Sequence, residues 1–310
     1  MKWLAERQDK LLPVPHFQVV FTLPSELRAL AQAAPAVVYS LLMSSAVKSL
    51  QSVLTTQYGA RFAVTAVLHT WTRELLLHPH VHIMVSAGGL SLDDTSWVPT
   101  GEDFLVSTRK LAPLFRGRML SGLRAAIRIG ELDLVEPLAS RREPLLQAAA
   151  SKTWVVHVEP PKKRSPGVIM KYLARYLFRV AIDDRRLLAH EGGMVTIRTR
   201  GKATATMSGA TFVRRFTQHA LPRGFRKIRH YGLLAPGNVA TRLGKAFELL
   251  GVRSVERATR AQAPDPTCDP SDDREPRERC PACGERALHI WSLAPVRGPP
   301  AIAAEQRPAA

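Results

Sequence analysis

Cysteine, aromatic residues and long apolar runs are scarce in this chain of 310 residues. Three cysteines are too few for a disulfide framework. We find no run of eighteen apolar residues, so we expect no membrane span. The first residues contain no apolar signal region either. Together these absences predict a cytoplasmic protein without a membrane partner.

Acidic residues are scarce in one segment in particular. The formal net charge of the chain is +18, and residues 161–260 hold 22 Lys and Arg against 5 Asp and Glu. The first 160 residues hold 16 against 13, and the last fifty hold 6 against 8. A basic block of this kind binds phosphates by releasing counterions. An acidic lipid surface or a merely solvated face would also fit, but the segment offers no amphipathic membrane helix. We therefore expect nucleic acid as the partner and a place at the nucleoid.

The pattern of apolar residues predicts an α+β fold. Strands are expected at 17–23, 61–70, 80–87 and 154–158, and helices at 35–57 and 104–129. This β-α-β-β-α-β order is the split-βαβ, ferredoxin-like arrangement with an antiparallel central sheet. Gly88-Gly89 is expected to end the third strand, and Pro113 to break the second helix.

The basic segment is predicted to add further elements. These are a helix over 165–182, a hairpin of 195–198 with 203–206, a helix near 209–221 and an ordered segment at 226–232. We expect three regions in all: a core with its last helix over 1–185, a basic accessory DNA-binding region over 186–260, and a mostly disordered tail over 261–310.

Two histidines one residue apart are candidate metal ligands. His80 and His82 would face the same side of one strand, about 7 Å apart, and could converge on one cation. His69 is the preferred third ligand, because an antiparallel turn over 71–79 would bring it beside the pair. Glu74 and His78 are the alternatives. The pair could also be two ordinary sheet histidines. No Asp follows two residues after His82, so the zinc-hydrolase pattern His-x-His-x-Asp is not present.

Two tyrosines four residues apart are candidate nucleophiles. Tyr172 and Tyr176 would lie one turn apart on the same helix face. A phenol has a pKa near 10, so it needs a nearby cation or base to attack at neutral pH. The alternative is a pair of tyrosines that pack their rings and expose their hydroxyls. The cations expected to contact DNA are Lys171, Arg175, Arg179, Arg226, Lys227 and Arg229.

The combination resembles the HUH superfamily of single-strand endonucleases, which carries His-hydrophobic-His on a central strand and one or two tyrosines on a later helix. More narrowly, it is similar to the two-tyrosine transposases of rolling-circle insertion sequences, the type named after insertion sequence ninety-one. The matching segments are residues 11–24, 65–71, 78–91, 171–182 and 221–234. These segments occur in the same order as in that family, and together they cover most of residues 3–250.

The resemblance implies a function and the residues that carry it. His80 and His82 would be the metal pair, holding Mg²⁺ or Mn²⁺, and Tyr172 and Tyr176 the nucleophiles. The eleven-residue step from His69 to His80 also resembles the three-histidine sites of conjugative relaxases. The implied reaction is cleavage of single-stranded DNA that leaves a 5′-phosphotyrosine and a free 3′-hydroxyl. The chain contains no Walker-type phosphate loop, so no nucleotide cofactor is expected.

The chain departs from that family at both ends. Family members usually begin with a cysteine-rich zinc module, whereas this sequence starts at Met1-Lys2-Trp3, where that module would end. A truncated copy or a wrongly chosen start codon would explain the difference. Cys280 and Cys283 form half of a zinc knuckle, which Cys268 and His289 would complete.

Three other functions remain open at this point. One is an inactive remnant that only binds single-stranded DNA, and another is a zinc-dependent hydrolase acting on a small molecule. An RNA-binding ferredoxin-like module is disfavoured, since the paired strands lack exposed aromatic residues.

Overall fold

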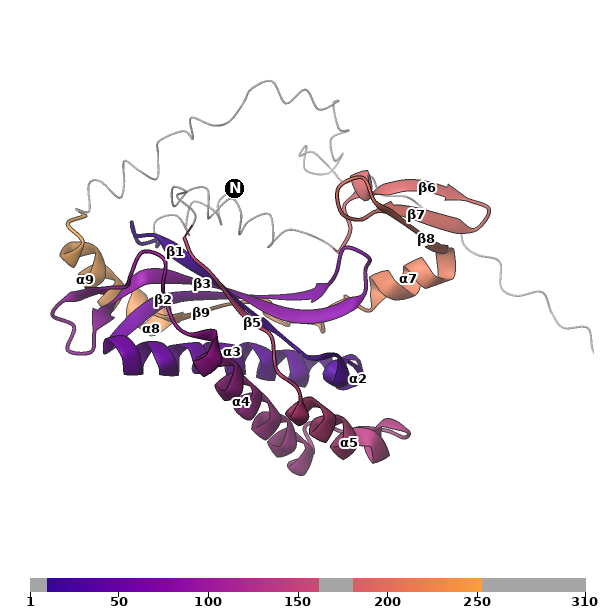
Figure 1. Cartoon of the computed structure of the whole chain (residues 1–310), viewed down its shortest axis with the longest axis horizontal. Coiled ribbons are helices and arrows are strands. Elements are labelled where there is room, and N and C mark those ends of the chain that lie inside the picture. The colour runs from indigo at the N-terminus through magenta and orange to yellow at the C-terminus, as the bar shows by residue number, and fades with distance from the viewer. Residues whose placement is uncertain (1–9, 162–180, 253–310) are drawn as a thin grey trace, which may run out of the picture. The chain divides into compact units, whose positions relative to one another are not determined.

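The computed structural model describes residues 10–161 and 181–252, and its central element is an antiparallel sheet (Figure 1). Six strands form it, in the order β5-β1-β3-β2-β9, with β4 paired to β3. Their bounds are β1 His16–Thr22, β2 Ala60–Trp71, β3 Leu77–Ser91, β4 Trp97–Pro99, β5 Val156–Glu159 and β9 Ile228–Gly232.

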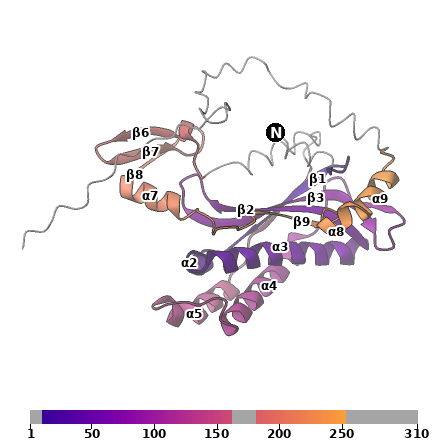
Figure 2. The same cartoon turned by 180° about the vertical axis from the view of Figure 1, so that it is seen from behind.

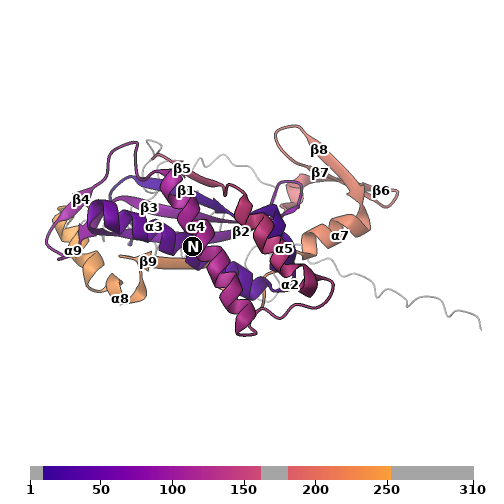
Figure 3. The same ribbon diagram turned by 60° about the horizontal axis from the view of Figure 1, so that its bottom comes forward.

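Helices cover one face of this sheet (Figures 1 and 3). They are the 3-10 helix Ser25–Leu27, α2 Arg28–Ala33, α3 Pro35–Tyr58, α4 Thr108–Arg128 and α5 Leu138–Ser151. The chain order confirms the predicted split-βαβ core of an α+β fold, to which α5 and the short strand β4 are additions.

Alternation of side chains along the strands explains why the helices lie on one face. In β1, Phe17, Val19 and Phe21 are fully buried. Gln18, Val20 and Thr22 alternate with them, lie on the other face and are partly exposed. Phe21 meets Phe115 of α4 edge to face, with the ring centroids 5.0 Å apart. The second face of the sheet therefore remains available for polar side chains.

Helix α3 is the longest apolar segment of the described residues. By length and composition it could cross a membrane, but 61% of its most apolar window is buried inside the protein. Eleven of its residues are buried, among them Leu42, Met43 and Leu50. Its apolarity thus fits a core helix that packs against the sheet.

The glycine pair does not end β3, as the sequence had suggested. β3 continues through Gly88 and Gly89 to Ser91, and β4 pairs with this extension. A Cβ on Gly88 would lie 2.7 Å from the Trp97 ring, and one on Gly89 would lie 2.7 Å from the carbonyl oxygen of Arg61. The glycines are therefore needed for close packing around the strand rather than for a turn.

Pro113 does not break the second helix either, and α4 runs from Thr108 to Arg128 without interruption. The proline lies in the second turn, where it removes a single backbone hydrogen bond. Leu111, Phe115 and Met119 on either side of it are fully buried. Their packing offsets the lost bond.

A second, smaller sheet follows the central core in the sequence. β6 Leu187–Glu191, β7 Met194–Arg198 and β8 Thr204–Ser208 pair in that order, and α7 Gly209–Thr217 follows. This confirms the predicted hairpin and the start of the next helix; β6 was not predicted. The helix expected at 165–182 lies outside the described residues except for Ala181 and Ile182, which form a bend.

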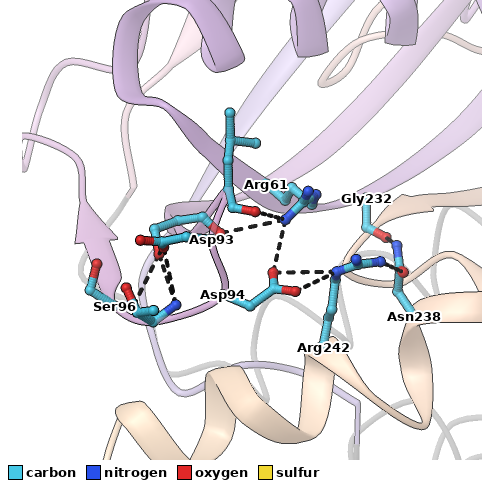
Figure 4. A network of polar contacts seen from close by, with 10 residues as sticks. Arg61, Asp93, Asp94, Ser96, Gly232, Asn238 and Arg242 are labelled. Atoms are coloured by element: carbon cyan, nitrogen blue, oxygen red, sulfur yellow. Dashed lines mark hydrogen bonds and ion pairs between the residues drawn. The ribbon is translucent and has the colours of Figure 1, made fainter.

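The last described segment returns to the central sheet. β9 pairs with β2 along its length (Figure 2), and α8 Pro236–Val239 and α9 Arg242–Leu249 follow it. Asp94, in the loop after β3, accepts from Arg61 of β2 at 2.8 Å and from Arg242 of α9 at 2.9 Å (Figure 4). This network ties α9 to the hairpin of β2 and β3.

Gly232 provides a test of how β9 is held. It adopts a φ of +59°, and an added Cβ would lie 1.9 Å from the carbonyl oxygen of Phe62, which already accepts a hydrogen bond from Leu233. An alanine in the left-handed region lowers stability by itself. Because of the clash with Phe62, we expect Gly232→Ala to lower the free energy of unfolding by about 1–3 kcal/mol beyond that backbone cost. Urea denaturation followed by circular dichroism measures this loss.

Gly224→Ala is the matched control. Gly224 has a similar φ of +75°, but nothing lies within 4 Å of an added Cβ. Equal losses in the two variants would show that the approach of β9 to Phe62 is not tight.

Candidate metal centre

Three histidines meet on the face of the sheet opposite helices α2 to α5, here called the open face. His80 and His82 alternate with the buried Val81 on β3, so they share that face. His69 of β2 is the direct Cα partner of His80. One ring nitrogen from each of the three lies within 4.8 Å of the others. The ring centroids are 5.4 Å apart for His69 and His80, and 4.6 Å apart for His69 and His82.

Hydrogen bonds fix which nitrogen of His80 faces the cluster. The carbonyl oxygen of His78 lies 2.6 Å from His80 Nδ1, and a carbonyl can only accept. His80 Nδ1 must therefore carry the proton, which leaves the lone pair on Nε2. This is the tautomer that a metal ligand requires.

Gln18 of β1 plays a corresponding part for His82. Its amide nitrogen, Nε2, lies 2.8 Å from His82 Nδ1 and donates to it when that ring nitrogen carries no proton. A half-turn of the amide would bring Oε1 to the same place, where it accepts from Nδ1–H and leaves the Nε2 lone pair of His82 available to a metal. Sequence reasoning missed Gln18, because its place beside His82 depends on how β1 registers with β3.

Burial keeps two of the ligand candidates, His80 and His82, neutral. It lowers the pKa of His80 to about 4, and it lowers the pKa of His82, which is also repelled by His80, to about 3. Only a neutral imidazole can donate a lone pair to a metal. Three imidazoles with ring nitrogens within 4.8 Å of one another form a donor set that fits a divalent transition-metal ion.

The two alternative ligands from the sequence do not join this cluster. Glu74 lies in the turn after β2, where its carbonyl oxygen accepts from Arg215 at 3.2 Å. The ring of His78 is 5.3 Å from that of His80, but His78 Nδ1 accepts from Arg28 at 3.2 Å. Of the predicted metal-ligand candidates, the structure brings together His69, His80 and His82.

The turn between β2 and β3 is held by the segment that follows the small sheet. Leu75 is fully buried with a φ of +60°. Its carbonyl oxygen lies 2.9 Å from Gln218 Nε2 and 3.1 Å from His219 Nε2. Next to this turn, the rings of Trp71 and His69 stack with their centroids 5.4 Å apart. These contacts restrain the end of β2 that carries His69.

The predicted DNA-binding cations divide into two groups. Lys171, Arg175 and Arg179 lie outside the described residues, as do the candidate nucleophiles Tyr172 and Tyr176. Arg226 and Lys227 directly precede β9 and Arg229 lies within it, and all three line a groove with a volume of about 890 Å³.

Comparisons with known proteins agree on one family. Residues 63–242 match the family described as "Putative transposase". The chain is 35% identical over 315 residues to "Putative transposase y4qJ" of Sinorhizobium fredii (strain NBRC 101917 / NGR234), covering 96% of this chain and 79% of that protein. No solved structure matches it.

A second relative carries a more specific name. The chain is 28% identical over 264 residues to "Transposase for insertion sequence element IS801" of Pseudomonas savastanoi pv. phaseolicola, covering 80% of this chain and 61% of that protein. These matches confirm the resemblance to insertion-sequence transposases that the motifs had indicated. Since the family match spans more than half of its residues, the chain belongs to the transposase family.

Proposed function

We propose that this transposase nicks single-stranded DNA with the help of a divalent metal and transfers the strand through a 5′-phosphotyrosine. The observation that carries the proposal is the cluster of His69, His80 and His82 on the open face of the sheet, with ring nitrogens within 4.8 Å of one another. Family membership supplies the DNA partner and the transposition reaction. The single-stranded substrate and the covalent intermediate are the proposed part.

The three histidines would hold Mg²⁺ or Mn²⁺. When bound, such an ion polarises a phosphate oxygen and neutralises charge on the phosphate under attack. Imidazole ligands are more usual for softer ions than Mg²⁺, so we expect Mn²⁺ to bind more tightly. Gln18 and the carbonyl oxygen of His78 would keep two of the rings in the ligating tautomer.

Tyr172 or Tyr176 would supply the nucleophile. The phenol oxygen forms a bond to the scissile phosphorus, the bond from phosphorus to the 3′-oxygen breaks, and the phenol proton passes to solvent or to the leaving oxygen. The phosphotyrosine conserves the bond energy, so the free 3′-hydroxyl can later reverse the reaction on another strand. A second tyrosine permits a second exchange without release of the first end.

We further propose that the three regions predicted from the sequence divide this work. Residues 1–185 would carry the chemistry and 186–260 the accessory contacts to DNA, with 261–310 as a tail. β9 belongs to the accessory region by position, yet it pairs with β2 of the core. We place the protein in the cytoplasm, at the nucleoid.

Loss of the metal ligands tests the first half of the proposal. We expect the double variant His80→Ala, His82→Ala to bind Mn²⁺ more than about 100-fold more weakly. Removing a residue that only supports a ligand typically lowers metal affinity by about 10–100-fold, and removing two ligands should lower it further. Titration calorimetry of the protein without DNA measures the dissociation constant.

Two further variants calibrate this measurement. His157→Ala removes an exposed histidine of β5 and should leave the affinity unchanged. Gln18→Leu removes no ligand and should weaken binding by about 10–100-fold. If His157→Ala were as damaging as the double variant, the assignment of the ligands would be wrong.

Proton release on metal binding tests the neutral state of the rings. A histidine with the ordinary pKa of 6.5 is about three-quarters protonated at pH 6, so three ordinary ligands would release about two protons. Since the pKa values of His80 and His82 are depressed to about 4 and about 3, these two rings are already neutral at pH 6. We expect release of fewer than about one proton per Mn²⁺. Calorimetry at pH 6 in buffers of different ionisation enthalpy counts the protons, and a count of two or more contradicts this account.

Formation of a covalent adduct tests the second half. Incubation with single-stranded DNA bearing the transposon end and Mn²⁺ should give a protein–DNA band that survives denaturing electrophoresis. The band should be lost in the double variant Tyr172→Phe, Tyr176→Phe, because a phenyl ring lacks the attacking oxygen.

Controls separate a missing nucleophile from a misfolded protein. Tyr58→Phe removes the hydroxyl of a tyrosine that instead donates to the carbonyl oxygen of Leu105 at 2.7 Å, and it should retain the adduct. An adduct that persists in the double variant would disprove the choice of nucleophiles. Binding without any adduct in the unmodified protein would indicate a DNA-binding remnant.

A further inference from the structure

A basic groove runs along the edge strand of the central sheet. It follows β9, the last strand in the sheet order, and has a volume of about 890 Å³. Four of its lining residues are cations: Lys10, Arg226, Lys227 and Arg229. Tyr231 also lines it, and no Asp or Glu does. With a rise of about 3.3 Å per residue, the five residues of β9 extend over about 17 Å, enough for a few nucleotides.

These cations lack acidic partners within the described ranges. No carboxylate of residues 10–161 or 181–252 forms an ion pair with Arg226, Lys227 or Arg229. Elsewhere in these ranges several basic residues are matched: Arg61 and Arg242 share Asp94, and Lys245 meets Glu248. Among the described residues, therefore, no carboxylate neutralises the groove, and its field favours a negatively charged ligand.

Two of the cations are held in place by the fold. Arg229 donates to Ser40 Oγ at 3.0 Å and to the carbonyl oxygen of Arg226 at 3.3 Å, and its guanidinium lies 5.3 Å from the centre of the Phe225 ring. Lys227 is partly buried, and burial lowers its pKa, so its charged form would gain from an anion close by. Such prior ordering reduces the entropy lost on binding.

The groove and the histidine cluster lie on neighbouring strands of the sheet. Arg229 and Tyr231 are paired with Ala66 and Val64 of the core beneath the helices, so these two side chains leave the edge strand on the helical side, whereas Ile228 shares the face of the histidines. His82 of β3 is paired with Val67 of β2, and Val67 with Ile228 of β9. The backbone nitrogen of Leu68, next to His69, donates to the carbonyl oxygen of Lys227 at 2.9 Å. The end of the groove that carries Arg226 and Lys227 is therefore the end that lies beside the metal ligands.

We propose that this groove binds the sugar–phosphate backbone of single-stranded DNA beside the scissile phosphate. Arg226, Lys227 and Arg229 would contact phosphates, and Tyr231 offers a ring on which an unpaired base can stack. The inference rests on the proposed function and extends it, because it assigns contacts to the substrate strand at the edge of the sheet, next to the strand that carries His69. Stacking on Tyr231 requires an unpaired base, so a single strand rather than a duplex is the occupant.

The experiment measures binding alone, so it does not depend on nicking. Fluorescence anisotropy with labelled oligothymidylate, the full chain and EDTA gives the dissociation constant over a series of salt concentrations. Each lost phosphate contact lowers the slope of log affinity against log salt by about 0.7 for a single strand. For the double variant Arg226→Ala, Lys227→Ala we expect a slope lower by about 1.4. The loss of affinity relative to the unmodified protein would then be roughly 25-fold greater at 0.1 M salt than at 1 M salt.

A charge-matched control removes two cations from the helical layer. Lys110 and Arg128 are exposed at the two ends of α4, on the layer that covers the opposite face of the sheet. Lys110→Ala, Arg128→Ala has the same net charge as the groove variant and should leave the slope nearly unchanged. Arg226→Lys, Lys227→Arg should restore the slope, and circular dichroism checks that each variant is folded.

The outcomes separate the groove from the chemistry. The binding assay contains EDTA and measures no cleavage, so its result does not depend on the metal centre or on the tyrosines. An unchanged slope in the groove variant, or an equal loss in the control, overturns the groove assignment. The single-strand assignment is wrong if duplex DNA binds as tightly as oligothymidylate and the groove variant lowers the salt slope equally for both. Absence of the adduct in every protein would refute the proposed function while leaving the groove measurement decisive.

Discussion

The antiparallel register between β2 and β3 is the constraint on which the site depends. It places His69 directly opposite His80, and His82 two residues further along the same face. A shift of one residue would turn His80 and His82 toward the helices and place Val81 in their position, since strand side chains alternate. Both ends of this strand pair are restrained. The turn is fixed by hydrogen bonds to the buried Leu75, and the far end by the close packing of Gly88 and Gly89.

Features that depend on local sequence were predicted well. The alternation around Val81 placed His80 and His82 on one face, and the apolar spacing located α3 to within one residue at its C-terminal end. Two interruptions of regular structure were predicted wrongly, at Gly88-Gly89 and at Pro113, and both errors have one cause. Glycine and proline usually interrupt a strand or a helix, but here tertiary packing keeps both elements regular. Trp97 occupies the space that a side chain at Gly88 would need, and Phe115 anchors the helix that contains Pro113.

Features that depend on pairing between distant segments could not be predicted in the same way. Gln18 reaches His82 across 64 positions of sequence because β1 pairs with β3. β9 was expected only as an ordered basic segment, and its pairing with β2 is what brings Lys227 next to Leu68. Neither partner is visible in the spacing of residues along the chain. The eleven-residue step from His69 to His80 was informative because one turn closes it.

The central sheet combines two opposite electrostatic environments. Around His80 and His82, burial disfavours positive charge on the rings, so protons are excluded and lone pairs are kept for a cation. Along the edge strand β9, by contrast, Arg229 is ordered on the helical side of the sheet by Ser40 and by the Phe225 ring, and no carboxylate of the described residues forms an ion pair with it. A phosphodiester needs both: a metal at the bond that breaks, and fixed positive charge along the neighbouring backbone. The pairing of β2 with β3 on one side and with β9 on the other places these environments on neighbouring strands. In the proposed function, one strand, β2, would therefore align the chemistry with the binding of its substrate.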